Sequence, residues 1–146
     1  MNVGSICTRK VITASPQLDM QAAAELMRQE HVGYLVVVPQ EPRGPQPPLG
    51  VLTDRDIVVT VVAKRADPAT LKVGDVMTRD PLVIEDGQSI EVVLRHMREA
   101  GVRRVPVVDH SGALTGGFSI DDVLERIAEQ LINFAGSIRN EQRMER

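Results

Sequence analysis

Two segments of the chain share a pattern of residues that could bind a phosphorylated ligand. Residues 50–56 (GVLTDRD) and 116–122 (GGFSIDD) each hold a glycine, two spacers, a hydroxyl residue, two more spacers and an aspartate. A hydroxyl between a strand and a helix lies beside the free amides and positive dipole end of the helix, which suit a phosphate. An aspartate one turn later can accept both hydroxyls of a ribose, and glycine allows close approach. The candidate residues here are Thr53, Asp56, Ser119 and Asp122.

The same residues also have a purely structural interpretation. A hydroxyl followed three residues later by an acid, ahead of an apolar helix, is an approximate capping box. Taken alone, either segment is more typical of a helix cap than of a ligand site. The two roles are compatible, because an N-cap hydroxyl can turn to a ligand at a cost of about 1 kcal/mol in helix stability.

The two segments belong to a longer internal repeat. Thr8-Arg9 returns as Thr78-Arg79, and the apolar helix stripe of 20–27 returns with the same spacing at 90–97. A valine-rich strand, a second strand and a second apolar helix follow in each copy. The sequence therefore predicts the order strand, helix, strand, strand, helix, twice.

This order predicts an α/β chain of the α+β type, made of two β-α-β-β-α repeats packed by pseudo-two-fold symmetry, with helices on one face of small sheets. The expected boundaries are 1–66 and 67–135, with 136–146 as a charged C-terminal tail. A repeat of about 60 to 70 residues is below the size at which a lone core is comfortably stable, so the two copies should pack together.

Composition excludes several functional classes. The chain has 146 residues, a net charge of -3 and 2% aromatic residues, which argues against a nucleic-acid surface. Cys7 is the only cysteine and the three histidines are scattered, so we expect no disulfide and no metal site. The sequence shows neither a targeting signal nor an apolar run long enough for a membrane, and we expect a cytoplasmic protein.

The doubled segments, together with Asp75-Val76-Met77-Thr78 and the run VRRVPVVD at 102–109, make the chain resemble the cystathionine-β-synthase (CBS) domain family over nearly its whole length. The resemblance implies a tandem CBS pair that binds an adenine nucleotide in clefts between its repeats. It also implies signal transduction to a partner by conformational change. The ligand classes are AMP, ADP, ATP or NAD, with S-adenosylmethionine and cyclic dinucleotides also found in the family, and no cofactor is obligatory.

The resemblance also assigns roles to residues. Asp56 and Asp122 would hold ribose hydroxyls, and Arg103 and Arg104 match positions that meet phosphate. The first copy has Gly33 and Tyr34 in their place, so the two clefts should differ, and Arg55 is a candidate to supply charge to one of them. The strand-like segments 11–13 and 82–84 would flank the adenine. The candidate ligand-binding residues are Ile12, Thr13, Tyr34, Thr53, Arg55, Asp56, Val83, Arg103, Arg104, Ser119 and Asp122.

Two other functions stay open. The first is a ligand-independent scaffold, a homodimer formed through the apolar helix faces, with an unidentified partner protein. The second is an enzyme, which is disfavoured because the chain has no phosphate loop, Rossmann turn or nucleophile elbow, and Cys7 has no evident base. The identity of the ligand, the occupancy of each cleft, the sign of regulation and the role of the proline-rich loop 39–48 are not predicted.

Overall fold

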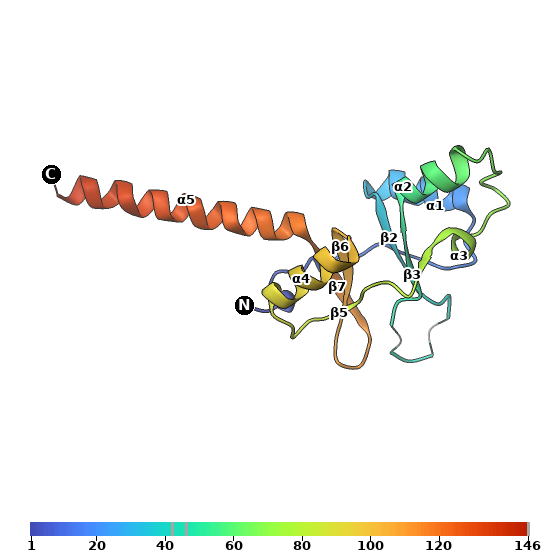
Figure 1. Cartoon of the computed structure of the whole chain (residues 1–146), viewed down its shortest axis with the longest axis horizontal. Helices are drawn as coiled ribbons and strands as arrows, with labels where there is room; N and C mark the ends of the chain where they lie inside the picture. Colours follow the sequence, from blue (N-terminus) through green and yellow to red (C-terminus); the bar gives the residue numbers. More distant parts are fainter. Residues whose placement is uncertain (42, 46, 146) are drawn as a thin grey trace.

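The computed structural model describes residues 1–41, 43–45 and 47–145. Two small sheets lie next to each other, each with its own helices, and a long C-terminal helix leaves the body (Figure 1). The prediction of a mixed fold with two small sheets and helices is confirmed.

The first sheet has four strands in the order β1-β2-β3-β4. They are β1 (Thr13–Ala14), β2 (Tyr34–Val37), β3 (Gly50–Thr53) and β4 (Thr78–Arg79). Strand β1 runs parallel to β2, and the other pairs are antiparallel. The helices of this half are α1 (Met20–Glu30), α2 (Asp54–Asp56), the π-helix η2 (Ile57–Val62) and α3 (Val73–Val76). Their apolar side chains form one core with Leu35, Val37 and Leu52 of the sheet.

The second sheet has three strands in the order β5-β6-β7. They are β5 (Ile84–Glu85), β6 (Arg104–Val108) and β7 (Leu114–Ser119), and the helices are the 3-10 turn η1 (Val3–Ser5), α4 (Ile90–Ala100) and α5 (Ile120–Met144). Helices α1 and α4 begin alike. The side chains of Asp19 and Ser89 cap them, because each accepts a hydrogen bond from the backbone amide three residues later. Ile84, Val107 and Phe118 are fully buried in a second, separate core.

The opening segment of each half crosses into the sheet of the other half. Strand β4 pairs with β3, and in the matching place Thr8 bridges to Gly117, with both backbone N–H···O distances at 2.9 Å. Val3 accordingly packs in the second core and Val73 in the first. The two repeats predicted at 1–66 and 67–135 therefore exchange their opening segments in space, because each unit is completed by the start of the other copy.

The glycine that opens each doubled segment is required by this crossing. A Cβ at Gly50 would lie 2.7 Å from the backbone oxygen of Thr78, and a Cβ at Gly116 would lie 2.7 Å from that of Thr8. No side chain fits at either place without a shift of the crossing strand.

The second helices of the two copies differ more than the sequence predicts. Helix η2 ends at Val62, and a turn follows in which Arg65 adopts a left-handed conformation with φ 53°. Helix α5 continues for 25 residues to Met144, so most of the segment predicted as a charged tail from 136 belongs to this helix. Most residues of 136–144 are good helix formers, which explains the continuation.

The proline-rich loop 39–48 joins β2 to β3. Two of its residues, Pro42 and Gln46, lie outside the described residues, as does Arg146 at the end of the predicted tail. The role of this loop stays unassigned.

Candidate functional site

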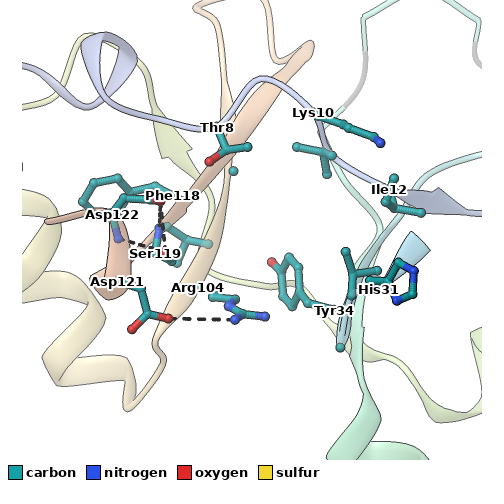
Figure 2. Close-up of a pocket in the computed structure, with 15 residues that line it drawn as sticks. Thr8, Lys10, Ile12, His31, Tyr34, Arg104, Phe118, Ser119, Asp121 and Asp122 are labelled. Carbon is teal, nitrogen blue, oxygen red and sulfur yellow. Dashed lines mark hydrogen bonds and ion pairs between the residues drawn. The ribbon is translucent and has the colours of Figure 1, made fainter. Parts of the chain in front are cut away.

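Two clefts lie between the halves, one beside each doubled segment. The Ser119 cleft, shown in Figure 2, has a volume of about 340 Å³ and is lined by Lys10, Ile12, Tyr34, Arg104, Ser119 and Asp122, among others. The Thr53 cleft has a volume of about 540 Å³ and is lined by Thr53, Arg55, Asp56, Thr78, Arg103 and Arg104, among others. Both volumes lie in the range of small-molecule sites.

The hydroxyl and aspartate of each doubled segment form a complete capping box. Asp56 Oδ2 accepts a hydrogen bond from the Thr53 amide at 2.9 Å, and Thr53 Oγ1 accepts one from the Asp56 amide at 3.1 Å. Asp122 Oδ2 likewise accepts from the Ser119 amide at 2.9 Å, and Ser119 Oγ accepts from the Asp122 amide at 3.3 Å. The structural interpretation of the segments is therefore confirmed.

Capping leaves part of each carboxylate available. In the described part of the chain, every hydrogen bond to Asp56 and Asp122 uses Oδ2, and none reaches Oδ1. A carboxylate oxygen can accept two hydrogen bonds, so each aspartate can serve the helix and a ligand hydroxyl together.

The residue opposite each hydroxyl differs between the clefts. In the second sheet Arg104 pairs with Ser119, and in the first sheet Tyr34 pairs with Thr53. Arg104 and Tyr34 both line both clefts, so they form a wall that the two sites share. Arg103, which directly precedes β6, lines only the Thr53 cleft.

Asp121 lines both clefts and lies within ion-pair distance of the two arginines. Its carboxylate lies 3.4 Å from Arg103 Nη2 and 3.9 Å from Arg104 Nη2. All three side chains are largely exposed, so these ion pairs add little stability. Both guanidinium groups can therefore be recruited by a ligand phosphate at small cost.

Tyr34 carries a buried hydroxyl in the shared wall. Among the described residues, no hydrogen-bond partner is found for its Oη. Burial raises the pKa of Tyr34 well above its ordinary range, an effect that the nearby positive charge of Arg104 only partly offsets. The phenol is therefore neutral, and Figure 2 shows it directed toward the Arg104 side of the Ser119 cleft.

Most of the predicted site residues come together in these clefts. Ile12, Tyr34, Arg104, Ser119 and Asp122 line the Ser119 cleft, and Tyr34, Thr53, Arg55, Asp56, Arg103 and Arg104 line the Thr53 cleft.

Two predicted residues fall outside the clefts. Thr13 and Val83, which occupy equivalent places in the two copies, do not contribute to the lining of either one. Their role in binding stays a prediction.

The sequence interpretation missed several lining residues. Thr8 and Lys10 reach the Ser119 cleft on the crossing segment, and Thr78 reaches the Thr53 cleft in the same way. The repetition of Thr8 as Thr78 in the sequence was a signal that could have identified these two as cleft residues. His31 also lines the Ser119 cleft, where it ends α1 in a left-handed conformation with φ 55°, as Gly101 ends α4 with φ 67°.

Two features are absent from the described residues, a cluster of metal ligands and a membrane-spanning helix. No group of three or more His, Cys, Asp or Glu side chains is placed to hold a metal ion there. None of the helices in the same residues combines the length and apolar character needed to span a membrane.

The family model of the CBS domain matches the chain twice, over residues 3–63 and 73–129. The chain belongs to the CBS domain family. The two matches correspond to the two copies of the repeat, and the doubled segments that line the clefts lie within them. The resemblance on which the sequence analysis relied is confirmed.

Relatives of this CBS pair cover most of its length. It is 34% identical over 122 residues to the CBS domain-containing protein YhcV of Bacillus subtilis, covering 84% of this chain and 82% of that one. It is 32% identical over 132 residues to Hypoxic response protein 1 of Mycobacterium tuberculosis, covering 90% and 85%. It is also 30% identical over 125 residues to an uncharacterized protein of Methanopyrus kandleri, covering 86% of this chain but only 62% of that protein.

Solved structures share the fold. Hypoxic Response Protein I with two coordinated zinc ions has a TM-score of 0.74 at 29% identity, covering 86% of this chain and 98% of that one. A CBS domain protein from Pyrobaculum aerophilum complexed with AMP has a TM-score of 0.74 at 24% identity, covering 84% and 89%, which is a likeness of fold.

Proposed function

We propose that this CBS pair is a non-catalytic regulatory module that binds an adenine nucleotide in the clefts between its halves. The observation that carries the proposal is the geometry of Asp56 and Asp122. Each holds its helix cap through Oδ2 and keeps Oδ1 free beside a cleft that also holds a guanidinium group. A helix cap alone needs neither the cleft nor the arginine.

The Ser119 cleft offers a place for each part of a nucleotide. Val11, Ile12 and Val32 supply apolar surface for a base, and the Asp122 carboxylate supplies acceptors for ribose hydroxyls. Arg104 and Lys10 supply positive charge for phosphate, and the guanidinium can bind two phosphate oxygens at once. The AMP complex of the Pyrobaculum aerophilum protein, which has the same fold, supports this choice of ligand class.

Calorimetric titration of nucleotide-free protein with AMP, ADP, ATP and NAD tests the proposal. Asp122→Asn and Asp56→Asn keep an amide oxygen to accept the cap hydrogen bond but replace the free carboxylate oxygen with a donor. We expect saturable binding by the wild type and an affinity at least about tenfold lower at the altered cleft, because a hydrogen bond to a charged group contributes about 1.5 to 3 kcal/mol.

Asp75→Asn is the matched control. Asp75 Oδ2 accepts a hydrogen bond from the Lys72 amide at 2.9 Å at the start of α3, outside both clefts. This variant should lose the same capping charge without losing affinity. Folded wild type that binds none of the four nucleotides, or two cleft variants that bind as the wild type does, would contradict the proposal.

Regulation requires the ligand to favour one arrangement of the halves or of the subunits over another. We place this sensing in the cytoplasm, with a second copy of the chain as the first partner and an unidentified regulated protein as the second. The exposed apolar residues Val58, Val62, Leu124 and Ile127 favour a homodimer. The same observation supports the second candidate function, a dimeric scaffold that needs no ligand.

A further inference from the structure

The end of helix α5 lies beyond the part of the chain that matches the CBS family. The match stops at residue 129, whereas α5 continues to Met144. Figure 1 shows this helix running away from the body of the protein, with its free end far from both sheets. The extension 130–144 therefore needs an explanation of its own.

One face of α5 carries a continuous apolar seam. Its members are spaced alternately by four and three residues, and they are Ile120, Leu124, Ile127, Leu131, Phe134 and Ile138. Ile120 packs against the second core. The five that follow are exposed, with Leu131 at 62% and Phe134 at 67%. A narrow stripe with this spacing is typical of a coiled-coil seam, which another helix with a similar stripe covers.

The residues that flank the seam do not repel a second copy of the same face. Asp121 borders Ile120 and pairs with Arg103, but the residues that border the exposed part of the seam are uncharged, namely Val123, Ala128, Gln130, Ala135 and Ser137. Charged side chains lie on the outer face, where Arg126 pairs with Glu129 at 3.4 Å. Because flanking charges decide which partner a coiled coil accepts, neutral flanks permit self-association.

The extent of the seam also requires a partner. Five large apolar side chains along a projecting helix form a contiguous surface, and contiguous apolar patches of more than a few hundred Å² mark interaction sites. A helix of this kind is stabilised mainly by packing of its apolar face. Within the described residues, α5 is the one helix long enough to offer a matching seam.

We propose that a second copy of this chain covers the seam, with α5 packed against α5. The inference rests on the homodimer proposed above and assigns its surface to the extension beyond the family match. It is independent of nucleotide binding.

Sedimentation equilibrium of the full chain tests this assignment. Leu131→Glu and Phe134→Glu place a carboxylate inside the seam, whereas Asn133→Glu places the same charge on the outer face of the same turn. We expect the wild type to be a dimer. Either seam substitution should raise the dissociation constant of the dimer at least about tenfold, because a buried charge is left unpaired. Asn133→Glu should leave the dissociation constant unchanged. Circular dichroism checks that α5 stays helical.

Val62→Glu separates the seam from the exposed apolar surface of the body. A dimer that resists both seam substitutions but dissociates with Val62→Glu would overturn the inference and leave the homodimer standing. A wild type that is monomeric at all concentrations would overturn both, and neither result depends on whether the clefts bind nucleotide. An equal rise in the dissociation constant for Asn133→Glu would also overturn the inference, because the added charge would then weaken the dimer from outside the seam.

Discussion

The two clefts are alike where they would hold a ribose and different where they would hold a phosphate. Each has a hydroxyl and an aspartate in a capping box, reached by a crossing strand. Opposite the hydroxyl, however, the Ser119 cleft has Arg104 and the Thr53 cleft has Tyr34. Two copies of one structural unit can therefore share a binding frame and still differ in the charge they offer a ligand.

The crossing segments add to this difference. Lys10 lines the Ser119 cleft, whereas Asp80, which occupies the equivalent place in the second copy, does not line the Thr53 cleft. The Thr53 cleft instead has Arg55 and Arg103 at its edge. In the proposed function, the Ser119 cleft thus offers Lys10 and Arg104 to a phosphate, and the Thr53 cleft offers Arg55, Arg103 and Arg104.

The largest effect should come from breaking the feature that the clefts share. Gly50→Ala and Gly116→Ala each place a Cβ 2.7 Å from the backbone of a crossing strand, so each should lower the free energy of unfolding by about 1 to 3 kcal/mol. Urea denaturation measures the loss. Gly87→Ala is the control, since a Cβ there meets nothing within 4 Å. If only one of the two variants is destabilised, the crossings are not equivalent.

The next effect should distinguish the two arginines. Arg104 lies opposite Ser119 and lines both clefts, while Arg103 is 76% exposed and lines one. Arg104→Ala should weaken AMP binding by about tenfold or more, because a charge-assisted hydrogen bond is lost, and should leave adenosine binding unchanged. Arg103→Ala should have a smaller effect on AMP. Calorimetry with both ligands decides, and a larger loss from Arg103→Ala would place the phosphate in the other cleft.

The smallest effect concerns Tyr34, the only tyrosine of the chain. Because burial raises its pKa in the folded state, the stability that the neutral phenol contributes is present below the pKa of the unfolded chain and is lost as the pH rises above it. Absorbance titration of the phenolate should show ionisation at higher pH in folded than in urea-unfolded protein. Equal midpoints would mean that the ring is not buried.

Tyr34→Phe tests the same hydroxyl without a change of pH. Since no partner for this oxygen is found among the described residues, its removal should leave the unfolding free energy unchanged or raise it by up to about 1 kcal/mol in ligand-free protein. A clear loss of stability would show that the hydroxyl has a partner.

Much of this protein follows from local patterns. The repeat, the order of elements and the hydroxyl–aspartate pairs were all predicted, because helix stripes, strand runs and capping boxes are set by residues a few positions apart. The capping geometry of Thr53 and Ser119 is of this kind. The predicted family followed from the same local signals in a fixed order.

The tertiary structure alone decided which segments complete which half. Thr8 bonds to Gly117 near the other end of the chain, and no local pattern specifies a strand partner at that distance. This pairing brings Lys10 into a cleft with Ser119 and makes Arg104 and Tyr34 a wall common to both sites. Hydrogen bonds between crossing strands join residues without regard to their separation in the sequence, so the sequence determined the parts of each site and only the fold determined how they combine.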